Sequence, residues 1–119
     1  RAILLPVSAP FHCSLMATAQ KNMISLISEL KIEKPTTPII SNITSMPTQE
    51  IEEIRENLIN QITGRVRWRE SILFMKKSGV KKVFEIGPGR VLCNLIRRIE
   101  NTIEQENISK VEDLFKLGN

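Results

Sequence analysis

The sequence is poor in the aromatic residues that stack on nucleic-acid bases. Its 119 residues include no tyrosine, one tryptophan and four phenylalanines, and these are not interleaved with the basic clusters. Single-stranded nucleic acids are bound by aromatic stacking within a basic groove. We therefore expect no nucleic-acid partner.

Long apolar runs are absent as well. No stretch approaches the roughly 20 apolar residues that a membrane-spanning helix requires, and no signal-peptide pattern opens the sequence. We expect no membrane partner and a cytoplasmic location. The sequence begins with Arg1 inside an apolar run and without methionine, which is what a segment of a longer chain would show.

Cysteine is scarce too. The two cysteines, Cys13 and Cys93, lie far apart and form no Cys-x-x-Cys pair. A structural zinc site or a disulfide framework needs more cysteines, or more closely spaced ones. We expect both thiols to be reduced and no metal ion to be bound.

The sequence does contain enough apolar residues for a core, together with a mild excess of positive charge. Hydrophobic residues make up 41% of the chain and the formal net charge is +4. The length fits one domain or a large piece of one. Small basic clusters at 76–77, 81–82 and 97–98 suit an acidic protein partner, or are simply solvated helix faces.

Apolar periodicity and turn residues predict an alternating order of strands and helices. Thr48 is expected to cap the second helix, and Gly79 to end the third. The expected strands cover residues 2–8, 38–44 and 80–86. The expected helices cover residues 14–31, about 49–62, about 68–78, about 91–99 and, in a short C-terminal turn, 111–117.

This β-α-β-α-α-β-α order predicts an α/β fold with a parallel sheet. Three strands make a narrow sheet whose two faces both need helices. The sequence therefore also predicts that this sheet continues in residues outside the chain.

The single histidine, His12, follows the first expected strand and precedes the first helix. Ligands of open α/β sheets bind beyond the carboxyl ends of the strands, and a neutral imidazole is a suitable general base near neutral pH. The alternative is a structural histidine. Cys13 is a poor candidate for a nucleophile paired with His12, because adjacent residues at a helix start point in different directions.

The segment Glu85–Val91 reads Glu-Ile-Gly-Pro-Gly-Arg-Val, a strand that enters a glycine turn before a helix. Backbone N–H groups at such a helix start can bind an anion. S-adenosylmethionine-dependent methyltransferases carry a similar turn, but usually with another glycine where this chain has Val91. A tight structural corner explains the same residues without a ligand.

Four motifs together resemble the malonyl-CoA:acyl carrier protein transacylases. Residues 5–16 (LPVSAPFHCSLM) resemble the histidine segment of that family, and residues 38–44 (PIISNIT) its next strand. Gln61 with Val66 and Trp68 matches the pattern Q-(x4)-V-x-W, and residues 83–92 resemble a late strand-turn-helix. The motifs occur in family order and cover nearly the whole chain. The Glu-Ile-Gly-Pro-Gly turn favours the stand-alone enzymes over the acyltransferase modules of polyketide synthases.

The resemblance implies part of an enzyme of fatty-acid biosynthesis. Malonyl would move from coenzyme A to a serine, and then to the phosphopantetheine thiol of acyl carrier protein. His12 would be the general base, and the main-chain carbonyl of Gln61 would accept a hydrogen bond from the other ring nitrogen. The side chain of Gln61 is then expected to matter little. Coenzyme A is part of the substrate, so no cofactor is implied.

The resemblance also assigns residues to substrate and partner binding. Phe11 would line the acyl pocket and favour malonyl over bulkier acyl groups, with Val7 and Val66 beside it. Ordinary core packing is the alternative for these three. Arg1 would lie near the docking face for acyl carrier protein, whose acidic surface it would attract.

Several parts of the family pattern are not in this sequence. It contains no Gly-x-Ser-x-Gly, the motif of a serine nucleophile at a strand-to-helix turn. Residues 1–119 would be a C-terminal fragment of the large, hydrolase-like acyltransferase domain, without the nucleophile-bearing half and the ferredoxin-like subdomain. We expect the fragment alone to be inactive. A methyltransferase fragment and a non-catalytic interaction domain of the same fold stay open as alternatives.

Overall fold

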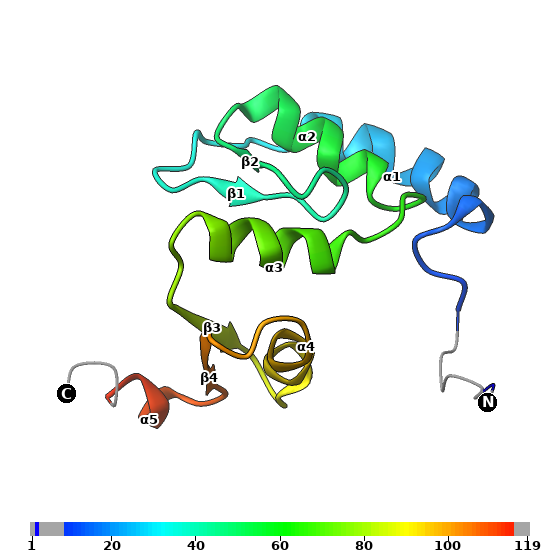
Figure 1. The fold of residues 1–119 in the computed structure, drawn as a ribbon. Helices are drawn as coiled ribbons and strands as arrows, with labels where there is room; N and C mark the ends of the chain where they lie inside the picture. Colours follow the sequence, from blue (N-terminus) through cyan, green and yellow to red (C-terminus); the bar gives the residue numbers. More distant parts are fainter. Residues whose placement is uncertain (1, 3–8, 116–119) are drawn as a thin grey trace. The chain divides into compact units, whose positions relative to one another are not determined.

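The computed structural model describes residue 2 and residues 9–115 (Figure 1). The chain divides into two compact units, Arg1–Trp68 and Arg69–Asn119. The strand expected at 2–8 therefore lies, apart from residue 2, outside the described residues. Each unit has its own buried apolar residues and is described by itself.

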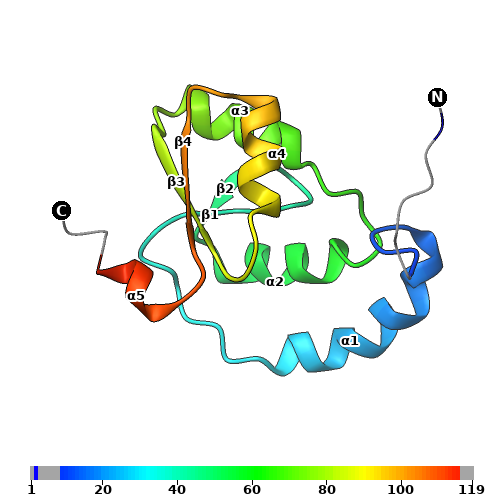
Figure 2. The ribbon, with the colours of Figure 1, turned by 90° about the horizontal axis from the view of Figure 1, so that it is seen from below.

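Unit 1 is built around two packed helices. A single 3₁₀ turn, η1 (Ser14–Met16), leads into α1 (Ala17–Glu29), and α2 (Ile51–Asn60) lies beside α1 (Figure 2). Ile27 of α1 and Ile54 of α2 are the buried apolar residues of this unit. In the sequence, the strands β1 (Ile39–Ile40) and β2 (Pro47–Thr48) come between these two helices, and they pair antiparallel with each other.

One arginine joins the two helices of unit 1. The guanidinium of Arg55, on α2, donates to the carbonyls of Ile27 and Ser28 at the end of α1, and to the carbonyl of Leu30. The last carbonyls of a helix have no partner within the helix, and a cation there also meets the negative end of the helix dipole. Arg55 therefore satisfies carbonyls at the C-terminal end of α1 and ties α2 to that end of the helix.

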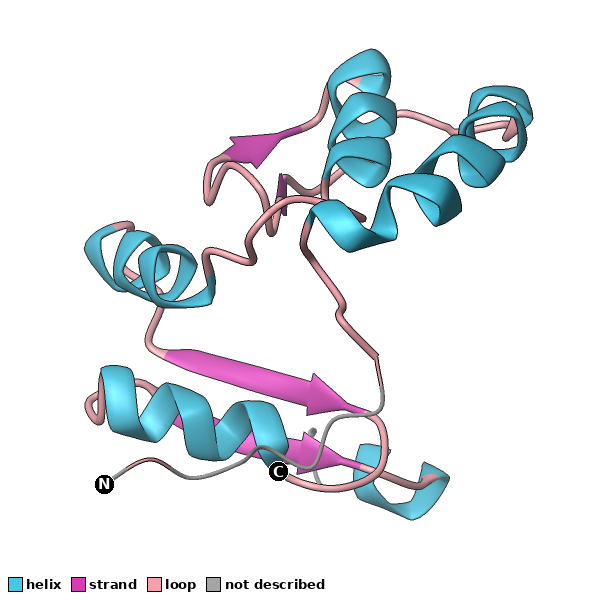
Figure 3. Cartoon of the chain, turned by 90° about the vertical axis from the view of Figure 1, so that its right-hand side faces the viewer, coloured by secondary structure: helices cyan, strands magenta, loops and turns pink. Residues whose placement is uncertain are grey.

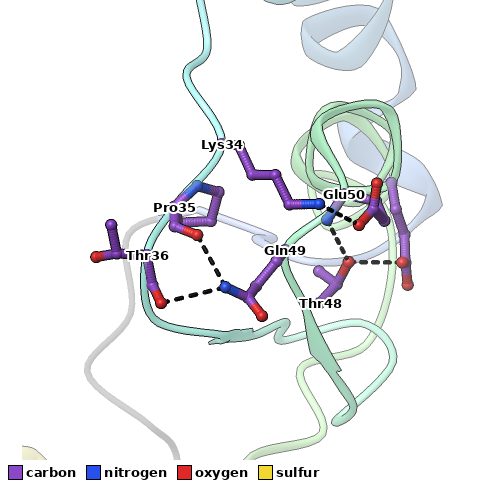
Figure 4. A network of polar contacts seen from close by, with 7 residues as sticks. Lys34, Pro35, Thr36, Thr48, Gln49 and Glu50 are labelled. Atoms are coloured by element: carbon purple, nitrogen blue, oxygen red, sulfur yellow. Dashed lines mark hydrogen bonds and ion pairs between the residues drawn. The ribbon is translucent and has the colours of Figure 1, made fainter.

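Thr48 does not cap α2 in the expected way. The helix begins at Ile51, and its N-cap residue is Glu50, two residues after the expected cap. The Thr48 hydroxyl accepts from the Glu50 N–H and donates to the Glu53 carboxylate at 2.6 Å (Figure 4). The same network holds the approach to β1, because the Gln49 amide donates to the carbonyls of two residues in that segment, Pro35 and Thr36.

Unit 2 contains a two-stranded parallel sheet. Strand β3 (Lys82–Ile86) pairs with β4 (Glu104–Ile108), and α4 (Val91–Ile99) connects them and packs on both (Figure 3). The helix α3 (Trp68–Lys77) precedes β3, and α5 (Val111–Leu114) follows β4. The buried apolar side chains of this unit are Ile72, Cys93, Ile96, Ile103 and Ile108.

The α/β class with a parallel sheet is confirmed, but the strands differ from expectation. The strand predicted at 38–44 is limited to Ile39–Ile40 and pairs antiparallel, since residues 42–44 form a turn. The sequence predicts no strand at Glu104–Ile108, because four of these five residues are polar and show no apolar alternation. One of these polar residues, Glu106, forms an ion pair at 2.8 Å with Lys82 on β3.

None of the helices in the described part of the chain is long and apolar enough to cross a membrane.

Candidate functional site

His12 occupies a special backbone position in unit 1. Its φ is 58°, in the left-handed region that few residues other than glycine adopt. The residue is exposed and lies in the turn before η1. Its ring nitrogen Nδ1 lies 2.7 Å from the main-chain oxygen of Gln61.

This contact selects one tautomer of the imidazole. A carbonyl oxygen can only accept a hydrogen bond, so Nδ1 must carry the proton. The other nitrogen, Nε2, is then left with a lone pair and can accept a proton from a reacting group. The arrangement is that of an oriented base in which a backbone oxygen takes the place of a carboxylate.

Gln61 is held at the point where α2 ends. It is the C-terminal cap of the helix, and its N–H donates to the Asn57 carbonyl at 3.0 Å. Its side-chain oxygen accepts from the Asn42 amide at 3.3 Å. Farther along, the Arg67 N–H donates to the Asn42 carbonyl at 2.8 Å.

A pocket of about 170 Å³ adjoins Gln61. Residues of β1, the turn after it and α2 line the pocket, among them Asn42 and Asn57. The Asn57 amide nitrogen is buried and has no hydrogen-bond partner among the described residues. The pocket is thus apolar at β1 and polar toward the end of α2.

Of the predicted site residues that the structure describes, Gln61 lines this pocket, whereas His12, Phe11 and Val66 do not. Phe11 precedes His12 in the same turn and is 61% exposed, and Val66, in the segment between α2 and α3, is half-buried. Val7 and Arg1 lie outside the described residues. The structure therefore brings His12 and Gln61 together and leaves the substrate-binding and carrier-binding roles as predictions.

The two cysteines have separate surroundings. The Cys13 thiol donates to the Pro10 carbonyl at 3.1 Å, so it points at a main-chain oxygen. Cys93 is fully buried in unit 2, and burial raises the pKa of its thiol. Among the described residues, no group of three or more histidine, cysteine, aspartate or glutamate side chains could hold a metal ion.

The glycine turn of unit 2 is closed by a carboxylate of the protein itself. Gly87 and Gly89 have φ values of 134° and 89°, which glycine adopts without strain. The Glu85 carboxylate accepts from the N–H groups of Cys93 at 2.9 Å and Leu92 at 3.0 Å, in the first turn of α4. These donors would otherwise face an anion, so the turn has the form of a structural corner.

Two residues have roles in the structure that the sequence-based predictions do not include. Glu85 belongs to the glycine-turn motif, but its capping of α4 depends on how β3 and α4 meet. Asn42 belongs to the segment predicted as a strand. An asparagine that follows a short apolar strand is a turn signal, and that signal was available in the sequence.

We predict that Glu85 stabilises α4 in a pH-dependent way. The N–H groups of Cys93 and Leu92 lower the pKa of the Glu85 carboxyl below its usual value. The contribution is therefore complete above the pKa of the unfolded chain, about 4.3, and is lost as pH falls through the lower folded value. Glu85→Gln should reduce the hydrogen-exchange protection of the Leu92 and Cys93 amides at neutral pH.

The same experiment has an acid arm and a control. Below the folded pKa of Glu85, the parent protein should lose protection at these two amides and approach the variant. Glu56→Gln, an exposed position on α2, should leave both amides unchanged. Equal protection in parent and Glu85→Gln at neutral pH would contradict this account of the turn.

Comparison with known proteins gives closely similar enzymes. The chain is 36% identical over 117 residues to a malonyl CoA-acyl carrier protein transacylase of Synechocystis. The matched region covers 98% of this chain and 40% of the relative. The crystal structure of an acyl-carrier-protein-S-malonyltransferase from Bartonella henselae matches with a TM-score of 0.90 and 41% identity, over 98% of this chain and 37% of that one. No protein-family model matches the chain.

A third match is a complex. It contains a type II polyketide synthase acyl carrier protein and its malonyl-transacylase, and matches with a TM-score of 0.87 and 34% identity, over 97% of this chain and 38% of that one. The chain thus spans about two fifths of the length of the relatives it matches. These matches give no support to the methyltransferase alternative.

Proposed function

We propose that this chain is part of a malonyl-CoA–acyl carrier protein transacylase, because it is similar to such enzymes over about two fifths of their length, and that it supplies the general base of the enzyme. In this proposal residues 1–119 are the C-terminal part of the large acyltransferase domain. The nucleophilic serine and the ferredoxin-like subdomain belong to other parts of the full-length protein, and the segment alone is inactive.

The observation that carries the proposal is the hydrogen bond between His12 Nδ1 and the Gln61 carbonyl, at 2.7 Å. It leaves Nε2 free to accept a proton, which is what a general base must do. In addition, His12 is exposed and not buried in the core. A purely structural histidine would gain little from an oriented, exposed Nε2.

In the proposed first half-reaction, His12 acts as the base. His12 Nε2 takes the proton of the serine hydroxyl as the serine oxygen attacks the thioester carbonyl of malonyl-CoA. The carbon–sulfur bond then breaks, and the protonated His12 returns its proton to the coenzyme A thiolate. The products are a malonyl-serine ester and free coenzyme A.

The second half-reaction uses the same base. His12 takes the proton of the phosphopantetheine thiol of acyl carrier protein, and the thiolate attacks the malonyl-serine ester. The serine oxygen leaves and recovers its proton from His12. Malonyl-CoA and acyl carrier protein are thus the substrates, coenzyme A leaves as a product, and the reaction uses no separate cofactor.

The remaining assignments rest on the family resemblance. We propose that Val7, Phe11 and Val66 contact the acyl group and that Arg1 contributes to carrier-protein docking. We also propose a cytoplasmic location, which is what the resemblance to enzymes of fatty-acid biosynthesis implies.

The proposal is tested by malonyl transfer in the full-length protein. Incubation with malonyl-CoA and acyl carrier protein should give malonyl-carrier, detected as a mass increase on the carrier. Equilibrium dialysis with S-adenosylmethionine, run in parallel, should show no binding. Absence of transfer from malonyl-CoA and from other acyl-CoA thioesters would support a non-catalytic interaction domain instead.

A further inference from the structure

We propose that Asn42 is a positioning residue, which holds the Gln61 carbonyl in line with His12. The inference rests on the proposed function, because it concerns the orientation of the base in that reaction. Asn42 does not touch the imidazole in this structure. It acts through Gln61, which it contacts directly.

Asn42 holds the chain on both sides of the turn that follows α2. Its side-chain amide donates to the Gln61 side-chain oxygen at 3.3 Å. Its main-chain carbonyl accepts from the Arg67 N–H at 2.8 Å. The segment from Gln61 to Arg67 is therefore tied to one residue at its two ends, and the carbonyl that orients His12 lies at one of them.

Asn42 itself lies in a firmly bonded turn. The Ser45 N–H donates to the Ser41 carbonyl at 2.9 Å, and the Ile43 N–H donates to the Ser41 hydroxyl at 3.2 Å. Ser45 is buried and has a φ of 57°, a left-handed conformation that its surroundings must maintain. A turn fixed in this way is a rigid base from which Asn42 can position Gln61.

The position of the Gln61 carbonyl matters because it selects the tautomer of His12. A hydrogen bond weakens steeply when its distance and angle depart from the optimum. If the Gln61 carbonyl moves, the imidazole can place its proton on Nε2 instead of Nδ1. That tautomer has no lone pair on Nε2 and cannot accept the serine proton, so the active fraction of the enzyme falls.

The test compares activity, stability and tautomer in one variant. Asn42→Leu removes the donor while keeping a side chain of similar size. In the full-length protein it should lower kcat/KM for malonyl transfer by about 5- to 10-fold, the loss expected for one hydrogen bond. In protein labelled with ¹⁵N-histidine, the His12 signals, identified by their loss in His12→Ala, should shift toward the Nε2–H tautomer at mildly alkaline pH.

A matched control separates positioning from general stability. Gln49→Met removes amide hydrogen bonds to the carbonyls of Pro35 and Thr36 in the same unit, away from Gln61. It should lower the thermal midpoint to a similar extent as Asn42→Leu. It should leave the tautomer of His12 and kcat/KM unchanged.

A double-mutant cycle shows whether Asn42 acts through Gln61. Gln61→Met removes the acceptor but keeps the main-chain carbonyl. The family resemblance alone implies that this side chain matters little, whereas the proposed role of Asn42 implies that its loss costs about as much as Asn42→Leu. The double variant should lose no more than either single variant, since both remove one interaction. If Asn42→Leu does not fold, Gln61→Met carries the tautomer measurement alone.

The outcomes of the inference and of the proposed function can be told apart. If His12→Ala transfers malonyl as fast as the parent, the proposed function fails. If His12→Ala is impaired but Asn42→Leu and Gln61→Met keep the parent tautomer and rate, only the role of Asn42 is wrong. Additive losses in the double variant would likewise overturn the positioning role.

Discussion

Replacing His12 by alanine should lower kcat/KM for malonyl transfer by roughly 10² to 10⁴, the contribution usual for a general base. The expectation follows from the 2.7 Å contact of Nδ1 with the Gln61 carbonyl, which leaves Nε2 as the only ring atom able to take a proton. Alanine has no proton acceptor at this place. Steady-state transfer from malonyl-CoA to acyl carrier protein in the full-length protein measures the loss.

His12→Asn is the matched control for the backbone at this position. Asparagine tolerates the left-handed conformation better than alanine does, and the φ of 58° would strain alanine. The amide of asparagine can donate a hydrogen bond but cannot act as a base near neutral pH. The asparagine variant should therefore keep a thermal midpoint close to that of the parent and lose as much activity as the alanine variant. Retained activity in His12→Asn would remove the base role from His12.

Gly64→Ala should have the second-largest effect, because this glycine is packed against the turn that carries Asn42. A Cβ at Gly64 would clash with Ile43 Cδ1 and would lie 2.8 Å from the Asn60 carbonyl oxygen. The first atom can move, since it ends a flexible side chain, but the second belongs to the last residue of α2. Overpacking of this kind costs about 1–3 kcal/mol of folding free energy.

The displacement should lower the activity of the site as well as the stability of the fold. Gly64 lies between Gln61 and Arg67, so a shift of this segment moves the carbonyl that orients His12. We expect a lower thermal midpoint and a reduced rate of malonyl transfer. Ile43→Val deletes the Cδ1 atom that the new methyl group would meet, so the double variant should recover part of both losses. A Gly64→Ala variant with parent stability would show that the turn is looser than described.

The helices could be predicted well from the sequence, and the reasons are local. The signals lie within short stretches of chain: the apolar spacing in α1 and α4, and the glycine after α3, Gly79, which has a positive φ. Strands depend on partners that are distant in the sequence. The polar strand β4 is recognisable only from its pairing with β3, where Glu106 meets Lys82. The strand at 38–44 is shorter than its apolar residues predict, because Ser41 and Ser45 are hydrogen-bonded to each other in a turn.

In the candidate site too, local features could be predicted from the sequence and contacts between distant residues could not. His12 stands out in the sequence as the single histidine, placed where the sequence predicts a turn from a strand into a helix. Its partner is a main-chain carbonyl 49 positions away, and a backbone oxygen has no residue type that a pattern could reveal. Only the family resemblance pointed to Gln61. The capping of α4 by Glu85 and the bond from Asn42 to Gln61 arise from tertiary packing, so periodicity and composition carry no sign of them.

The most direct test of the account is the formation of the acyl-enzyme in a single turnover. The full-length protein and its His12→Asn variant are mixed with malonyl-CoA, without carrier protein, and the intact mass is followed with time. The account predicts a malonyl adduct that forms rapidly in the parent and at least about 100-fold more slowly in the variant. An adduct that forms equally fast in both proteins would contradict the assignment of His12 as the base.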